Sequence, residues 1–199
     1  MKHEFSSTDT KLTEVLANFA DNPRELINYL QTHSLLLGML VTGSNQELVL
    51  SSTPNYNALA VFSNQDLLLS FKADARPAIF TGRELAELTL SSGSGLIEID
   101  PPNGVIITGS MARAIVNVAN WVDPAEDQEL TQIIENYLRA AGQTEFRIER
   151  GSWTDIRIFL KGEFEKVAPV ASSLGQFLSQ SQTAVENLPS GADILYQES

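Results

Sequence analysis

Short apolar runs alternate with amphipathic runs in the middle of the chain, at positions 58–121. The apolar runs have the length of strands, whereas the amphipathic runs place apolar side chains three and four positions apart, as one face of a helix requires. The amphipathic runs open with residue types that commonly cap helices: Asn64 with Ser63 before it, Thr81, and Ser110. This pattern predicts strands and helices in alternation, the last helix ending near residue 121.

The same alternation predicts two β-hairpins on either side of these helices. Apolar residues at 96–99 and 105–108 are separated by the turn-forming sequence PPNG at 101–104, and a second pair of strands is expected at 35–41 and 47–51. Before them, residues 11–19 have one apolar helical face, and Asn22-Pro23 opens a second helix as N-cap and first helical residue. The first part of the chain is therefore expected to begin with a helical hairpin.

A boundary is predicted at Asp123-Pro124, where an N-cap, a proline at the first helical position and an acidic first turn coincide. The elements expected after it are a helix, a hairpin, a second helix and a closing strand, at 124–142, 145–150 with 156–160, 163–184 and 192–196. Pro169 should delay the start of the second helix or kink it. We expect an α+β fold with a mixed sheet and flanking helices, divided into a domain at 1–122 and a smaller α-β-β-α-β domain at 123–199.

The composition excludes several classes of binding partner and of catalytic or metal site. Thirteen Lys and Arg against 25 Asp and Glu give a formal net charge of −12, which repels phosphate backbones and anionic lipids and argues against nucleic-acid and membrane partners. The absence of Cys excludes disulfides, thiolate nucleophiles and cysteine-based metal sites. No signal-peptide pattern and no apolar run of about 18 residues are present, so we expect a cytoplasmic protein.

No catalytic constellation is recognisable in the sequence. The two histidines, His3 and His33, lie near a terminus and at the end of a predicted helix, where solvent exposure or capping explains them. Glu98 and Asp100 are two apart on a predicted strand and could hold Mg²⁺ or act as acid and base, but the solvent-facing side of a half-buried strand is the favoured interpretation. We therefore expect no enzymatic activity, no cofactor and no metal site.

Two stretches remain as candidate binding sites. Thr81, Gly82 and Arg83 lie at a predicted helix start, where backbone N–H groups could bind an anion, although a capping box of Thr81 with Glu84 explains the same residues. The predicted hairpin at 145–160 concentrates cations and aromatic side chains on one face and at its turn. These candidate partner-binding residues are Arg147, Trp153, Arg157, Phe159 and Lys161. Cross-strand charge pairing is the alternative explanation, weighed about evenly with a docking surface.

Three short segments and the order of elements resemble the SseB family of bacterial proteins. The segments are residues 59–66 (LAVFSNQD), 95–101 (GLIEIDP) and 188–194 (LPSGADI). The resemblance covers nearly the whole chain and implies the family's N-terminal domain followed by a short C-terminal domain. It carries over no catalytic residue, and it suggests a link to serine metabolism only through the phenotype for which the family is named.

Three hypotheses about function follow from the sequence. The first is a non-enzymatic protein-interaction module, with the 145–161 hairpin as its docking surface and a homodimer left open. The second is a small-ligand sensor or an enzyme of amino-acid metabolism, suggested by the resemblance and by the helix start at Thr81. The third is an acidic immunity-type protein that neutralises a basic toxin, for which the negative charge is the only support.

Overall fold

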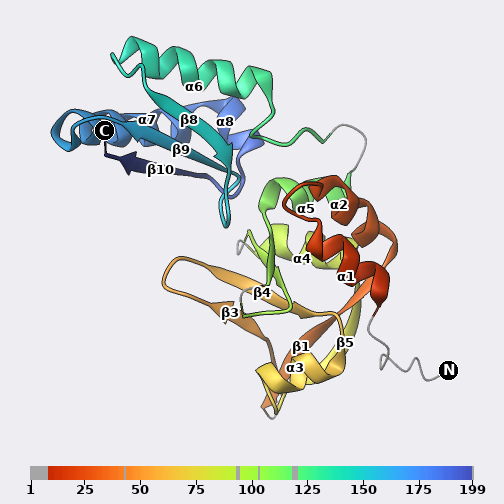
Figure 1. Ribbon diagram of the computed structural model, residues 1–199. Helices are drawn as coiled ribbons and strands as arrows, with labels where there is room; N and C mark the ends of the chain where they lie inside the picture. The colour runs from red at the N-terminus through yellow and green to blue at the C-terminus, as the bar shows by residue number, and fades with distance from the viewer. Residues whose placement is uncertain (1–8, 43, 93–94, 103, 118–120, 199) are drawn as a thin grey trace. The chain divides into compact units, whose positions relative to one another are not determined.

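A computed structural model of the chain describes residues 9–42, 44–92, 95–102, 104–117 and 121–198. It divides into two compact units (Figure 1). The N-terminal unit comprises Met1–Ile107 and Met111–Asn120, and the C-terminal unit comprises Thr108–Ser110 and Trp121–Ser199. Both units combine helices with a sheet, which confirms the predicted α+β class.

The N-terminal unit contains a mixed sheet and short helices. Its helices are α1 (Thr10–Ala17), α2 (Pro23–Thr32), α3 (Gln65–Phe71), α4 (Gly82–Ser92) and α5 (Gly109–Val116), the last of which has its first two residues grouped with the C-terminal unit. Its strands are β1 (Ser34–Thr42), β2 (Asn45–Leu48), β3 (Leu50–Ser52), β4 (Asn57–Phe62), β5 (Arg76–Thr81), β6 (Ile97–Ile99) and β7 (Val105–Ile107). Both predicted helix starts at Pro23 and after Asn64 are confirmed.

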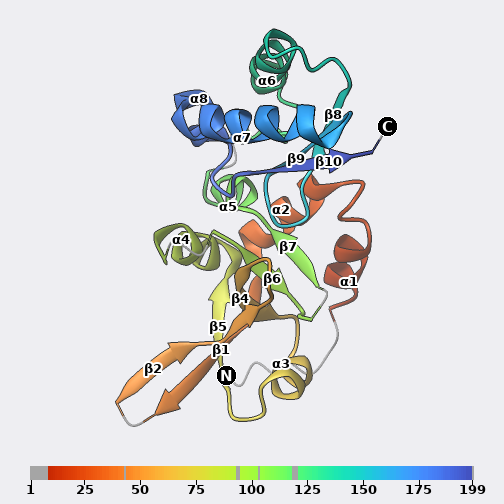
Figure 2. The same cartoon turned by 90° about the vertical axis from the view of Figure 1, so that its left-hand side faces the viewer.

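Strand β1 organises the sheet of the N-terminal unit. It pairs antiparallel with β2, β4 and β5, and the β1–β2 hairpin extends away from the rest of the sheet (Figure 2). Strand β4 pairs parallel with β6, and β6 pairs antiparallel with β7, so the predicted hairpin of residues 96–108 is present. Leu68 of α3 packs on Leu36, Ala60 and Phe62, which closes one apolar cluster over the sheet.

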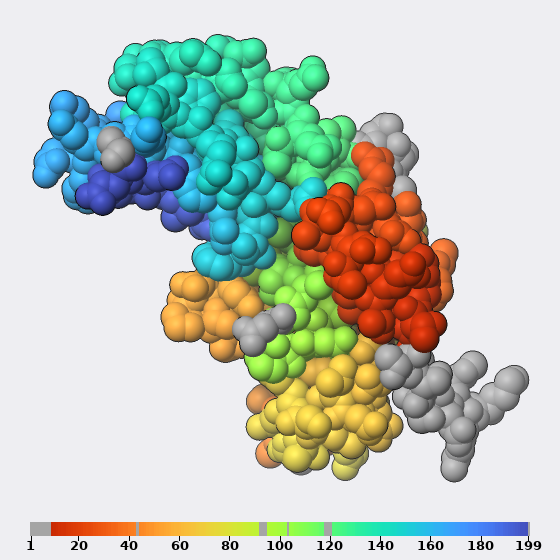
Figure 3. All heavy atoms as spheres, viewed as in Figure 1, coloured from red at the N-terminus to blue at the C-terminus, as the bar shows by residue number. Residues whose placement is uncertain are grey.

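The C-terminal unit follows the predicted order, with one of its helices divided in two. Its elements are α6 (Gln128–Ala140), β8 (Phe146–Arg150), β9 (Ile156–Lys161), α7 (Phe164–Gln180), α8 (Gln182–Asn187) and β10 (Ala192–Gln197). The sheet order is β10-β9-β8, with β10 parallel and β8 antiparallel to the central strand. Side chains of these strands reach the surface of the molecule, where they appear in teal, cyan and dark blue (Figure 3).

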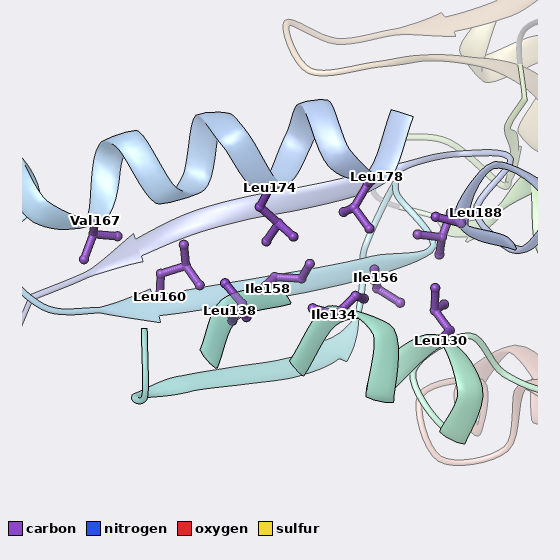
Figure 4. Packing of buried hydrophobic residues seen from close by; sticks show 11 residues of the cluster. Leu130, Ile134, Leu138, Ile156, Ile158, Leu160, Val167, Leu174, Leu178 and Leu188 are labelled. Atoms are coloured by element: carbon purple, nitrogen blue, oxygen red, sulfur yellow. The ribbon is translucent and has the colours of Figure 1, made fainter. Parts of the chain in front are cut away.

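The core of the C-terminal unit lies between the helices and one face of β9. Leucine and isoleucine side chains of α6 meet Ile156, Ile158 and Leu160, and α7 covers the same side of the sheet (Figure 4). Because side chains alternate along a strand, the residues between them point to the opposite face, which these helices leave open. The open face of this sheet therefore carries Arg157, Phe159 and Lys161.

Three predicted helices differ from the observed ones at their boundaries. Helix α6 begins after Asp127, whose carboxylate accepts hydrogen bonds from two N–H groups of the first turn, and not after Asp123. Asp123 is buried instead, where it accepts from the Ala125 N–H and pairs with Arg150 at 2.6 Å. Asp123 therefore forms a long-range ion pair with Arg150, although local capping preferences favour it as the N-cap of this helix.

The other two differences concern helix length. Helix α5 starts at Gly109, two residues before the start at Met111 that Ser110 as N-cap predicts, and it ends at Val116 rather than near Trp121. Helix α7 starts at Phe164 without delay, and it contains Pro169 on its exposed side, where water can satisfy the carbonyl that the proline leaves without a donor. A break at Ser181 separates α7 from α8, and the Ser181 hydroxyl accepts from the Ala184 N–H.

Candidate functional site

The open face of the C-terminal sheet brings together residues from its three strands. In the middle row, Arg147 of β8 lies opposite Phe159 of β9, and Phe159 lies beside Leu195 of β10. In the next row, Glu149, Arg157 and Asp193 are neighbours in the same way. Trp153 belongs to the turn between β8 and β9. All five residues that the sequence singles out as partner-binding candidates therefore lie on this face or at its turn.

Both arginines of the open face lie over aromatic rings. The Arg147 guanidinium carbon is 4.5 Å from the centre of the Phe159 ring, and that of Arg157 is 5.0 Å from the Trp153 ring. Such cation–π contacts contribute roughly 0.5–1 kcal/mol each at exposed sites. They also hold long side chains in one orientation, so the face is partly ordered before any partner arrives.

Each cation of the open face also has a carboxylate neighbour. Lys161 Nζ is 3.1 Å from Glu145, Arg147 Nε is 3.4 Å from Glu149, and Arg157 Nε is 3.8 Å from Asp193. The cross-strand charge pairing that the sequence left as an alternative explanation is thus present between Arg157 and Asp193, beside the half-buried rings of Phe159 and Trp153. Exposed ion pairs contribute about 0.2–1 kcal/mol, so the Lys161–Glu145 and Arg147–Glu149 pairs arrange charge on the face more than they stabilise the fold.

The Arg157–Asp193 pair is the least complete of these contacts. At 3.8 Å the two atoms are beyond hydrogen-bond distance, and both Arg157 Nε and Asp193 Oδ2 are buried without a hydrogen-bond partner among the residues that the structure describes. A buried polar atom without a partner costs roughly 1–3 kcal/mol. This pair therefore has donor and acceptor capacity that the fold itself does not use.

A hollow of about 330 Å³ opens at one end of this face. It is lined by Thr144, Glu145, Phe146, Arg147, Phe159, Lys161 and Gln197. Its lining combines the charged side chains of Glu145, Arg147 and Lys161 with the rings of Phe146 and Phe159.

The turn that carries Trp153 is held in one conformation by backbone contacts. A Cβ atom on Gly151 would lie 2.2 Å from the Thr154 carbonyl oxygen, so only glycine fits there, and the Thr154 hydroxyl donates to the Ile156 carbonyl. Asp155 is buried and accepts hydrogen bonds from the Ser110 and Ser190 N–H groups. Burial raises the pKa of this carboxyl above its ordinary value, although these hydrogen bonds oppose the rise.

The alternative anion site at Thr81, Gly82 and Arg83 is already occupied by the protein's own groups. The Glu84 carboxylate accepts from the Thr81 N–H at 2.8 Å and from its hydroxyl, and the Glu84 N–H donates to Thr81 Oγ1, forming a complete capping box. The Gly82 N–H donates to the His33 carbonyl, and a Cβ on Gly82 would lie 2.1 Å from the Leu30 carbonyl oxygen. Glycine is therefore required by the close approach of α2. Arg83 pairs with Glu87.

The predicted solvent-facing position of Glu98 is wrong, since its exposed fraction is only 1%. One Glu98 carboxylate oxygen accepts a hydrogen bond from the Gly104 N–H. Desolvation raises the pKa of Tyr56, and the negative charge of Glu98 raises it further. Asp100 lies beyond the end of β6, where it accepts from the Ser63 N–H at 2.7 Å. The two carboxylates therefore serve different parts of the backbone and do not form an acid–base pair.

The remaining candidates have structural roles or lie outside the described residues. His33 ends α2, with Nδ1 2.8 Å from the Tyr29 carbonyl oxygen and its ring stacked on that of Tyr29 at 3.8 Å. His3 lies outside the described residues. Within the part of the chain that the structure describes, no three His, Asp or Glu residues are grouped as metal ligands, and no helix has the length and apolar character needed to cross a membrane.

Comparison of the chain with models of protein families, with curated proteins and with solved structures finds no match. The resemblance to the SseB family therefore stays a prediction from the sequence, and the site is interpreted from its own geometry.

Proposed function

We propose that this chain is a non-enzymatic cytoplasmic protein of the SseB type that binds a protein partner through the open face of its C-terminal sheet. One observation carries the proposal: helices cover one face of that sheet, while the other presents two arginine–aromatic pairs to the outside. Trp and Arg are enriched among the residues that dominate binding energy at protein interfaces.

The charge arrangement of this face supports recognition of a specific partner. Cations and carboxylates alternate across the strands, so a partner must place opposite charges in matching positions. The same alternation makes binding sensitive to salt, because much of the attraction is between exposed charges.

The small-ligand hypothesis receives less support. Its candidate residues form a capping box and a close contact between backbones, which explains Thr81 and Gly82 without a ligand. The immunity-type hypothesis still rests on net charge alone.

The proposal is tested with the double variant Arg157→Glu/Lys161→Glu, used as bait in affinity capture from a bacterial lysate with proteins quantified by mass spectrometry. Lys72→Glu/Arg83→Glu is the matched control, because it changes the net charge equally at exposed ion pairs of the N-terminal unit. We expect a partner that the wild type and the control capture at low salt and that the first variant loses by at least tenfold. Equal capture by all three proteins would refute the assignment of the face, and unchanged circular dichroism shows that the variant is folded.

A further inference from the structure

An exposed aromatic pair lies on the other side of β10. Phe164, the first residue of α7, has an exposed fraction of 58%, the highest of the large hydrophobic side chains in the described ranges. The Tyr196 ring meets it edge-on with 5.6 Å between ring centres, and Tyr196 is itself 42% exposed. Ile194, two positions earlier on β10, still packs against the core. The apolar side of β10 is therefore packed against the core at Ile194 but exposed at Tyr196, where the ring contacts Phe164.

Acidic residues occur at both ends of this region, in the first turn of α7 and just after β10. Partial desolvation raises the pKa of the Tyr196 hydroxyl above its ordinary value, and the negative charges of Glu198, Glu165 and Glu163 raise it further. Lys166 pairs with Glu163 at 2.6 Å and leaves the other two carboxylates to set the sign of the patch. The helix dipole explains acidic residues in the first turn of α7, but it explains neither Glu198 nor the exposed rings.

Strand β10 also has an unpaired edge. Among the described residues it pairs with β9 and with no other strand, so its second row of backbone N–H and C=O groups is available. An exposed edge of this kind is a template for pairing with another chain. Extended peptides commonly bind by adding a strand to such an edge, while pockets or patches beside it select their side chains.

We propose that an extended basic segment of another protein adds to β10 as a further strand and places a Lys or Arg side chain over the Phe164–Tyr196 pair. The negative charges beside the aromatic pair favour a positively charged side chain as the group that binds there. A cation gains from the ring faces and from Glu165 and Glu198 at once. A second copy of this chain is disfavoured, because its own net charge is −12 and β10 would meet the same carboxylates on its partner. This surface lies at the outer edge of β10 and on the helix side of the sheet, away from the open face, so it does not depend on the proposed function.

The first test selects binders for the full chain from a displayed library of random dodecapeptides. The library is also applied to Phe164→Ser/Tyr196→Ser and to the control Val122→Ser/Val185→Ser, which removes two equally exposed side chains of the same unit. We expect peptides with Lys or Arg between apolar residues, binding the wild type and the control alike and the first variant at least tenfold more weakly. Failure to enrich basic peptides, or equal binding to the Phe164/Tyr196 variant, overturns the proposal.

The second test uses a synthetic peptide with the enriched sequence. N-methylation of alternate amides blocks one edge of a strand, so methylation in one register should abolish binding and methylation in the other should not. Tolerance of both registers overturns strand addition. Binding should also weaken in Glu165→Lys/Glu198→Lys and persist in Glu126→Lys/Glu186→Lys. It should persist in the open-face variant described above, which separates this surface from the proposed function.

Discussion

The two sides of strand β9 differ in burial and in the residues that they carry. Ile158 and Leu160 are fully buried against α6 and α7, whereas Arg157, Phe159 and Lys161 alternate with them and face away from the helices. The buried side is uniformly apolar. The open side carries cations that each have a carboxylate nearby: Glu149 on the same strand for Arg147, Asp193 on β10 for Arg157, and Glu145 just before β8 for Lys161.

The largest expected effect comes from the buried side. Ile158→Ala should lower the free energy of unfolding by about 2–5 kcal/mol, because it removes buried methyl groups and leaves a cavity. Urea titration followed by circular dichroism measures the loss. Phe159→Ala, its neighbour on the open side, should cost less than half as much. Equal losses would show that both faces belong to the core.

The next effect concerns a buried ion pair at the end of β8. Asp123→Asn should destabilise the protein by about 1–3 kcal/mol, because it leaves the partly buried Arg150 beside a neutral amide. The same urea titration measures it. Arg150→Lys should recover part of the wild-type stability, since it keeps the charge but loses the guanidinium geometry. No loss in Asp123→Asn would contradict the structural role of this pair.

A pH-dependent effect is expected at Asp155, which continues the alternation of the open-face residues but is buried. Its folded-state pKa is raised above the value of 3.8 expected in the unfolded chain. The folded protein therefore holds this proton more tightly than the unfolded chain does. Its free energy of unfolding should fall as the pH rises from the pKa of Asp155 in the unfolded chain to its higher pKa in the folded protein. The stability of the wild type relative to Asp155→Asn should decline over this interval and then become constant. Thermal melts from pH 3 to pH 7 measure the difference, and a rising difference would contradict the direction of the shift.

The smallest effect belongs to the exposed pairs of the open face. Glu145→Gln removes the partner of Lys161 at a position where both side chains are largely exposed, so the stability change should stay within about 0.5 kcal/mol. Capture of the partner should nevertheless change by several-fold and become less sensitive to salt. If Glu145→Gln changed the stability and left capture unchanged, the open side would contribute to folding rather than to binding, which would contradict the prediction.

Local sequence signals predict those parts of the fold that neighbouring residues determine. The hairpin around Trp153, the capping box at Thr81 and the helix end at Gly142, which has a positive φ of 81°, follow from alternation and capping preferences within a few residues. The five partner-binding candidates share a face for the same reason, because β8 and β9 are adjacent in sequence.

Contacts between distant residues could not be predicted in this way. Asp193 reaches Arg157 only because β10 pairs parallel with β9, and Asp123 is withdrawn from helix capping by Arg150. Glu98 is buried although its neighbours in the sequence alternate in the manner of a half-exposed strand, because β6 is an inner strand that pairs with β4 on one edge and β7 on the other, and all three of its residues are buried. In each case the partner is selected by the fold rather than by local spacing.

The parallel pairing of β10 with β9 also determines the order in which this sheet forms and opens. A short turn joins β8 to β9, whereas α7 and α8 separate β9 from β10, and the entropy cost of closing a loop grows with its length. The hairpin should therefore form early and β10 should join it late, so that β10 can detach without unfolding the rest of the unit. Amide protons of β10 should exchange with solvent faster than those of β9. A partner that binds this strand on either side will then be detected as slower exchange along residues 192–197.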